Sequence, residues 1–160
     1  MSATTFIRCM CVAAGGAWIA CGLAGGQVCV LDTRTGQPRA HWRAHDGEVL
    51  RLAAVDNNRL LSSGLDQVTA LWRVDDGELI AHLKGTTEPV HCLSVYYNEL
   101  ISGTTNNRIG VHTSMDQEAS FSSTKLRSDT FKGVLTCMSV LPLNRLLLLG
   151  SDNGTISLLC

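Results

Sequence analysis

The chain has 160 residues, of which 45% are hydrophobic and 17% are charged. This length suits one domain, and the composition excludes a chain that is disordered over most of its length. Lys and Arg number 13 and Asp and Glu number 14, giving a formal net charge of −1. That balance argues against a protein that holds nucleic acid mainly by charge, and we expect no nucleic-acid partner.

The first part of the chain, from Cys9 to Leu31, carries no charged residue and follows Arg8. A stretch of this kind is compatible with the core of a signal peptide or with a weak membrane span. Glycines interrupt it, however, at the places where turns between short strands are expected. We therefore favour strands here and keep a targeting segment as the alternative.

Short apolar runs of similar sequence recur along the chain. They begin at Ile7, Val49, Val90 and Leu135. Each is followed by a second and a third apolar run, and the runs are bounded by Gly, Asn, Asp or Ser. The third runs end at Leu31, Trp72, His112 and Leu159, at intervals of 41, 40 and 47 residues. The sequence therefore repeats itself, with a unit of about 40 residues.

The runs are rich in Val, Ile, Leu and Cys, which is typical of strands, and no segment shows a helical period. A fourth run is present where Gly36–His45 aligns with Gly77–Thr86. Asn57-Asn58 and Asn153-Gly154 suit hairpin turns with positive φ. These patterns predict an all-β chain of antiparallel meanders, which bury both faces only by stacking on one another. We expect four such meanders, near residues 6–44, 45–85, 86–130 and 131–160, the last without its fourth strand.

At this point the chain resembles the WD-repeat β-propellers, most clearly in its second repeat. His45, Ser62, Asp66 and Trp72 occupy the positions that form a hydrogen-bonded chain of side chains in that family. The resemblance implies that Asp66 accepts from His45, that His45 meets the Ser62 hydroxyl, and that this hydroxyl meets the Trp72 indole N–H. Such pairing is needed because a buried polar group left unpaired costs about 1–3 kcal/mol.

The other repeats depart from this pattern. At the tryptophan position stand Leu31, His112 and Leu159. At the aspartate position stand Gly25, Asn106 and Asn153. We expect apolar packing, more than the polar chain, to hold these repeats together.

Three stretches are similar to the C-terminal repeats of BEACH-domain proteins: FIRCMCVAAGG from Phe6, RAHDGEVLRL from Arg43 and LLLLGSDNGTISLLC from Leu146. Members of that family are large scaffolds. The resemblance implies a cytoplasmic location, peripheral on endosomal or lysosomal membranes. It also implies a role in membrane traffic, phosphoinositide control and autophagy.

The predicted blades are fewer than the seven usual in WD-repeat propellers, so we expect an incomplete ring whose exposed edges need further blades or self-association.

Candidates for chemistry are few. The seven cysteines are odd in number and contain no Cys-x-x-Cys pair, so we expect reduced, mostly buried thiols and no zinc site. Cys92 beside His91 and His45 near Asp46 are the catalytic candidates by residue type. Neighbours on a strand point to opposite faces, so His91 and Cys92 cannot cooperate within one strand. We predict a protein without enzyme activity or cofactor, with a Cys-dependent hydrolase as the alternative.

Two surface features are candidates for binding. Arg34, Arg39 and Arg43 form a candidate strip for anionic lipid or an acidic peptide, or alternatively solvated charges that protect a sheet edge. Residues 113–130 contain 8 Ser or Thr among 18 residues. We expect a mobile surface insertion there, with a phosphorylated docking segment as the alternative.

The leading functional hypothesis is a non-catalytic scaffold for protein partners. The alternative is a propeller that binds phosphoinositide headgroups directly. Lipid-binding propellers of the autophagy type carry an adjacent Arg-Arg pair, and this sequence has none. The hypothesis of a protein scaffold is therefore the stronger of the two.

Overall fold

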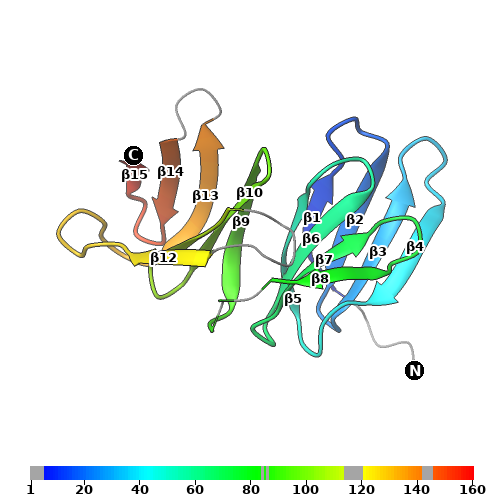
Figure 1. Cartoon of the computed structure of the whole chain (residues 1–160), viewed down its shortest axis with the longest axis horizontal. Coiled ribbons are helices and arrows are strands. Elements are labelled where there is room, and N and C mark those ends of the chain that lie inside the picture. The colour runs from blue at the N-terminus through cyan, green and yellow to red at the C-terminus, as the bar shows by residue number, and fades with distance from the viewer. Residues whose placement is uncertain (1–5, 84, 86, 114–120, 142–145) are drawn as a thin grey trace. The chain divides into compact units, whose positions relative to one another are not determined.

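The structure, a computed structural model, describes residues 6–83, 85, 87–113, 121–141 and 146–160. Within these ranges the chain forms 15 strands and no helix (Figure 1). Consecutive strands pair into antiparallel sheets, three of them four-stranded and one three-stranded. The predicted all-β architecture of antiparallel meanders is therefore confirmed. We number the sheets as blades 1 to 4 in chain order.

Blades 1 and 2 are four-stranded meanders. Blade 1 comprises β1 (Ile7–Val12), β2 (Trp18–Leu23), β3 (Gln27–Asp32) and β4 (Pro38–Arg43). Blade 2 comprises β5 (Val49–Ala54), β6 (Arg59–Gly64), β7 (Thr69–Arg73) and β8 (Leu79–His82). The uncharged stretch from Cys9 to Leu31 thus forms strands β1 to β3, as its glycines predict. The described residues contain no helix long and apolar enough to cross a membrane.

Blade 3 has four strands and blade 4 has three among the described residues. Blade 3 comprises β9 (Val90–Tyr96), β10 (Glu99–Thr104), β11 (Arg108–His112) and β12 (Phe121–Lys125). Blade 4 comprises β13 (Leu135–Leu141), β14 (Leu146–Ser151) and β15 (Ile156–Leu159). Strand β12 takes up part of the segment 113–130 that we expected to be a surface insertion. Residues 114–120 of that segment lie outside the described residues, and its phosphorylation stays a prediction.

The chain divides into two compact units, one ending at Pro89 and the other beginning at Val90. In the first unit, blades 1 and 2 bury a core between their faces that includes Trp18, Ala20, Val28, Val30 and Leu60. In the second unit, blades 3 and 4 bury a core that includes Ile101, Ile109, Leu135, Leu147 and Leu149. Burying one such aliphatic side chain contributes about 1.5–3 kcal/mol. Pairwise stacking of blades is therefore what stabilises each unit.

The turn between β5 and β6 differs from its prediction. Among the described non-glycine residues, positive φ occurs at Gln67, Tyr97 and Asn107 and not at Asn57 or Asn58. The Asp56 carboxylate instead accepts the N–H groups of Asn58 and Arg59, each at 2.8 Å. A side chain that closes the turn in this way removes the need for a left-handed residue. The predicted left-handed turn does occur between β14 and β15, where Gly154 has a φ of 83°.

Candidate functional site

Blade 2 carries a chain of hydrogen-bonded side chains drawn from separate segments. His45 precedes β5, Ser62 lies on β6, and Trp72 lies on β7. His45 Nδ1 lies 3.0 Å from Oδ1 of Asp66, and His45 Nε2 lies 2.7 Å from Ser62 Oγ. Trp72 Nε1 donates to the same Ser62 oxygen at 2.7 Å. The structure therefore brings together the four side chains to which the family resemblance points.

The side chains at the two ends, Asp66 and Trp72, fix the directions of the two outer hydrogen bonds. An ionised carboxylate only accepts and an indole N–H only donates. Asp66 therefore receives the Nδ1–H of His45, and Ser62 receives the N–H of Trp72. The Ser62 oxygen has two lone pairs, so the direction of its bond with His45 Nε2 depends on the protonation state of the imidazole. In a neutral ring whose proton is on Nδ1, facing Asp66, Nε2 carries no proton and the Ser62 hydroxyl donates to it.

Burial and charge act on His45 in opposite directions. The His45 side chain is 0% exposed. Burial lowers the pKa of His45 below its ordinary value of 6.5, and the neighbouring Asp66 carboxylate offsets part of this effect. A lowered pKa favours the neutral ring at neutral pH. The neutral ring therefore accepts the Ser62 hydroxyl hydrogen at Nε2 and keeps its own proton on Nδ1.

Asp66 also links two loop segments to the hydrogen-bonded side chains of blade 2. Its Oδ2 accepts the backbone N–H of Asp46 at 3.0 Å, and its Oδ1 accepts the N–H of Val68 at 3.1 Å. These bonds connect the segment before β5 with the turn between β6 and β7. The carboxylate therefore positions backbone as well as the imidazole of His45.

The order Asp66, His45 and Ser62 reproduces the connectivity of a hydrolase triad, but its surroundings differ. A nucleophile must be reached by its substrate. Ser62 is 0% exposed, and its oxygen already accepts a hydrogen bond from Trp72. The hydroxyl cannot meet a substrate while blade 2 is folded. The arrangement therefore positions and satisfies buried side chains.

The other candidates for chemistry also lie in structural settings. His91 and Cys92 are successive residues of β9, and Cys92 is buried. Burial raises the pKa of Cys9 to about 11 and that of Cys11 to about 12, which is opposite to the shift of a nucleophilic thiol. Within the described ranges, no group of three or more His, Cys, Asp or Glu side chains is placed to hold a metal ion.

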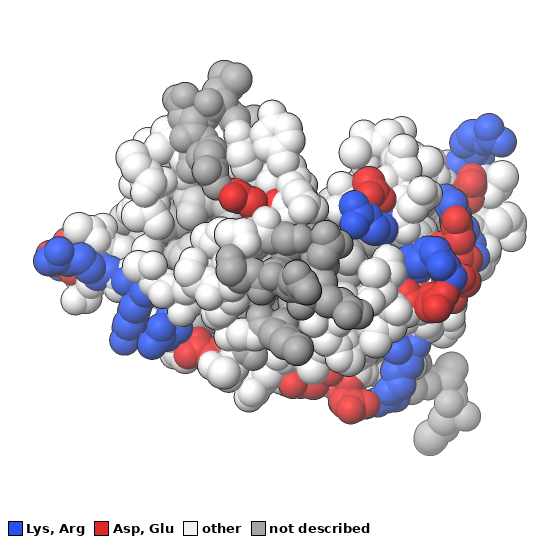
Figure 2. Space-filling model, in the orientation of Figure 1, with Lys and Arg blue, Asp and Glu red and all other residues white. Residues whose placement is uncertain are grey.

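The candidate arginine strip has carboxylates beside it. Arg39 and Arg43 lie on β4, whereas Arg34 lies in the preceding turn. The Arg39 guanidinium contacts the Asp75 carboxylate, and Arg43 Nε lies 3.8 Å from Oδ1 of Asp46. On the face seen in Figure 2, positive and negative side chains lie interleaved over the first unit. The neighbouring carboxylates reduce the positive electrostatic potential at this strip, and an anion would have to compete with them for the arginines.

Sequence reasoning missed the residue that takes the place of His45 in blade 4. Phe131 lies four positions before the start of β13, as His45 lies four positions before β5, and it is 3% exposed. The signal was present in the glycine spacing, because Gly133 precedes Leu135 as Gly47 precedes Val49. Blade 4 therefore contains a phenylalanine where blade 2 has the central histidine.

Blade 3 places His112 at the tryptophan position. Its ring is 1% exposed and lies 4.5 Å from the ring of Phe121, centroid to centroid. Burial lowers the pKa of His112. Its Nε2 has no hydrogen-bond partner among the described residues. The ring therefore packs as an aromatic side chain and does not rebuild the polar chain of blade 2.

The chain is similar to WD repeat-containing protein 81 from two vertebrates. It is 42% identical to the Danio rerio protein over 154 residues and 38% identical to the Homo sapiens protein over 153 residues. Each match covers 96% of this chain, and the chain spans 8% of the length of each relative. No protein-family model matches the chain.

A solved structure with the same fold is that of the computationally designed Ika4 protein. The two superpose with a TM-score of 0.76 at 22% sequence identity. The match covers 98% of this chain and 91% of the designed chain. At this level of identity the likeness concerns the fold alone.

Proposed function

Because the chain is a WD-repeat β-propeller segment, similar over almost its whole length to WD repeat-containing protein 81, we propose that it is a non-catalytic scaffold that binds other proteins. One observation carries this proposal. The side chains that most resemble catalytic machinery, Asp66, His45 and Ser62, are engaged with one another and with Trp72 inside blade 2. These side chains stabilise blade 2, so the binding of partner proteins falls to residues on the protein surface.

Exposed apolar side chains supply surfaces of the kind that bind proteins. On β1, Met10 is 59% exposed and Val12 is 53% exposed. On β15, Ile156 is 71% exposed and Leu158 is 62% exposed. Contiguous exposed apolar residues are typical of protein contact sites. These strands therefore support a binding role more directly than the paired arginines of β4 do.

The resemblance to BEACH-domain proteins carries the proposal one step further. We propose that the scaffold acts in the cytoplasm, peripherally on endosomal or lysosomal membranes. Its work there would concern membrane traffic, phosphoinositide levels and autophagy. In this proposal the chain reaches the membrane through protein partners, because Arg39 and Arg43 already lie beside carboxylates.

Vesicle flotation with the purified chain separates this proposal from direct lipid binding. Vesicles of phosphatidylcholine with and without phosphatidylinositol 3-phosphate are mixed with the chain and floated on a density gradient. We expect the chain to stay at the bottom of the gradient with both kinds of vesicle. Flotation that requires the phosphoinositide, and that Arg39→Ala with Arg43→Ala abolishes, would favour the lipid-binding alternative.

Affinity capture tests the protein-binding role itself. The immobilised folded chain is incubated with extract of cells that make the protein, and each retained protein is then purified and titrated against the chain. We expect at least one partner that binds saturably and is competed by the free chain. A folded chain to which no retained protein binds when purified would contradict a scaffold role.

A further inference from the structure

The three tryptophans of the chain lie at one interface, that between blades 1 and 2. Trp18 is 0% exposed, and its Nε1 donates across the interface to the carbonyl of Asn57 at 2.7 Å. The rings of Trp42 on blade 1 and Trp72 on blade 2 lie 5.8 Å apart, centroid to centroid. Three indoles therefore lie at the interface between these two blades.

The strand registers identify the counterparts of the two blade 1 tryptophans in blade 3. Trp18 is the first residue of β2, and Glu99 is the first residue of β10. Trp42 pairs with the second residue of β3, and Thr124 pairs with the second residue of β11. At the interface of the second unit, a carboxylate and a short hydroxyl side chain therefore replace two indoles.

The third tryptophan has its counterpart in blade 4. Trp72 pairs with Leu60, the second residue of β6, and Leu159 pairs with Leu147, the second residue of β14. All three tryptophan positions of the first interface are thus occupied by smaller side chains in the second. The interface between blades 3 and 4 cannot be filled in the same way.

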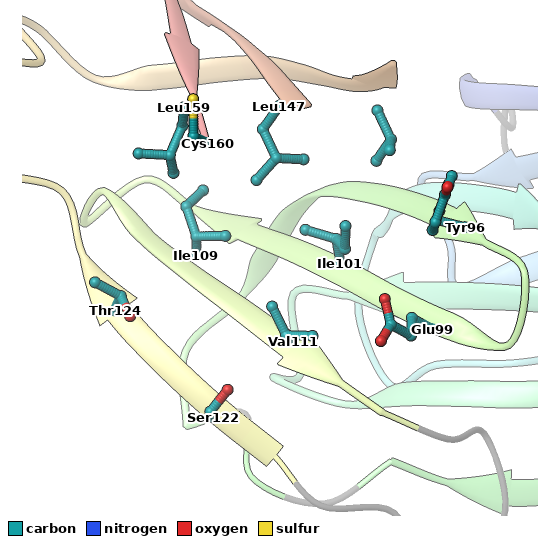
Figure 3. Close-up of a pocket in the computed structure, with 11 residues that line it drawn as sticks. Tyr96, Glu99, Ile101, Ile109, Val111, Ser122, Thr124, Leu147, Leu159 and Cys160 are labelled. Atoms are coloured by element: carbon teal, nitrogen blue, oxygen red, sulfur yellow. The ribbon is translucent and has the colours of Figure 1, made fainter. Parts of the chain in front are cut away.

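A cavity of about 470 Å³ lies at this interface. All three counterparts, Glu99, Thr124 and Leu159, line it. Figure 3 shows Ile101 and Ile109 of blade 3 facing Leu147 of blade 4 across the space, with Glu99 at one end. The hollow therefore coincides with the positions where the first unit holds its indoles.

We propose that this cavity binds a bulky aromatic side chain, best a tryptophan, of a partner protein that carries a basic residue next to it. This inference rests on the proposed scaffold function and specifies the chemistry of one partner. The walls are mostly aliphatic, so an aromatic ring regains the packing that the second interface lacks. Tryptophan is also enriched among the residues that dominate binding energy at protein interfaces.

Glu99 supplies the preference for a basic neighbour. It is the one charged side chain among the described residues that line the cavity. A carboxylate has about four lone-pair sites, so Glu99 can accept an indole N–H or attract a cation in addition to the contact that it already makes. An acidic residue next to the aromatic one would be disfavoured for the same reason.

Three short peptides test this preference on the full 160-residue chain. They are acetyl-Gly-Lys-Trp-Gly-amide, its alanine analogue acetyl-Gly-Lys-Ala-Gly-amide, and its acidic analogue acetyl-Gly-Glu-Trp-Gly-amide. Methyl-labelled protein is titrated with each peptide to about 5 mM, a range suited to weak binding. The Lys-Trp peptide should shift the methyl signals of Ile101, Ile109 and Leu147 saturably. The acidic analogue should bind more weakly, and the alanine analogue should leave these signals unchanged.

Two variants of β12 provide a matched pair. Thr124→Trp places an indole into the cavity from the protein's own chain, whereas Ser123→Trp places one on the opposite face of the same strand. Thr124→Trp should weaken binding of the Lys-Trp peptide about tenfold or more, and Ser123→Trp should leave it unchanged. Glu99→Gln should weaken it about two- to fivefold and should remove the disadvantage of the acidic analogue.

The outcomes separate this inference from the scaffold function. The absence of saturable shifts in the cavity methyls of the folded parent chain would overturn the inference without any variant. Equal peptide binding by folded Thr124→Trp and by the parent chain would overturn it as well. Protein partners that bind the parent and Thr124→Trp equally well would leave the scaffold function standing and would exclude the cavity as their site.

Discussion

Blades 2 and 4 fill the same positions of the repeat in different ways. Blade 2 has His45, Ser62 and Trp72, and blade 4 has Phe131, Leu149 and Leu159. In blade 2 directional hydrogen bonds join the three side chains. In blade 4 apolar residues of the core occupy the same places. The repeat therefore does not depend on one kind of interaction.

Substitutions in blade 2 and in blade 4 should reduce the free energy of unfolding for different physical reasons. Removing one member of a polar chain leaves the others buried without partners, and the cost is set by desolvation. Removing part of an apolar cluster leaves a cavity, and the cost follows the volume lost. Tryptophan fluorescence reports on the first unit, which holds all three tryptophans, so the responses of the two units can be measured separately.

The largest effect is expected in blade 4. Leu149 is 1% exposed, and Leu149→Ala should reduce the free energy of unfolding by about 2–5 kcal/mol. Urea denaturation followed by circular dichroism measures the loss. Leu158→Ala removes a leucine that is 62% exposed and should cost about 0.5 kcal/mol or less. Similar losses for the two variants would contradict the placement of Leu149 in the core.

A smaller loss is expected in blade 2. Ser62→Ala removes the oxygen that both His45 and Trp72 use, and should cost about 1–3 kcal/mol by tryptophan fluorescence in urea. Ser123→Ala on the exposed face of β12 is the control and should cost about 0.5 kcal/mol or less. An unchanged unfolding midpoint in Ser62→Ala would show that the polar chain does not stabilise the blade.

Coupling between the hydrogen bonds of the polar chain would distinguish blade 2 further from blade 4. Asp66→Ala should also cost about 1–3 kcal/mol, because it removes the acceptor for His45 Nδ1–H. If the chain acts as a unit, the Ser62→Ala/Asp66→Ala double variant should lose less than the sum, with a coupling of about 0.5–3 kcal/mol. Strict additivity in urea denaturation would mean that the two bonds act independently.

The pH dependence of stability should follow from the buried histidines. Burial lowers the pKa values of His45 and His112 below 6.5, so below that pH the unfolded chain binds more protons than the folded chain. Stability should therefore be full above pH 6.5 and fall as the pH drops towards the lowered values. Carboxylates such as Asp32, whose pKa the Thr35 N–H lowers from 3.8, act only at more acidic pH.

Thermal melts between pH 7.5 and 5 measure this dependence. The His112→Phe variant isolates the contribution of His45, and its melting temperature should still fall with pH when followed by tryptophan fluorescence. A melting temperature of the first unit that rises or stays level from pH 7 to 5 would contradict the neutral state assigned to His45.

The smallest effect is expected at the surface. Arg39 is 31% exposed and Asp75 56% exposed, and their ion pair joins β4 to the turn after β7. Arg39→Ala should cost about 1 kcal/mol or less in urea denaturation, and less in high salt. A loss as large as that of Ser62→Ala would mean that the contact between these blades depends on this pair.

The strands and the polar chain could be predicted from the sequence because both follow from local spacing. Apolar runs at regular intervals mark the strands, and His45, Ser62, Asp66 and Trp72 lie at fixed offsets from them. The cavity between blades 3 and 4 could not be predicted in this way. It depends on which side-chain volumes meet across two sheets, and on the register that sets Glu99 and Thr124 opposite blade 4.

Two smaller misses have similar causes. Asp56 closes its turn through a side-chain bond, whereas the dipeptide Asn57-Asn58 points to a left-handed turn. Phe131 was not predicted because its residue type does not indicate that it occupies the position of His45 in the repeat. In each case the residue type is misleading, and only the position relative to the strands identifies its role.

Nitrogen NMR of the His45 ring tests the central claim most directly, namely that the triad-like side chains of blade 2 form a closed structural chain. At pH 7 the account predicts a neutral ring with its proton on Nδ1, an unprotonated Nε2, and a Trp72 indole N–H protected from exchange with solvent. A protonated Nε2, or a Trp72 N–H that exchanges as fast as a free indole, would contradict it.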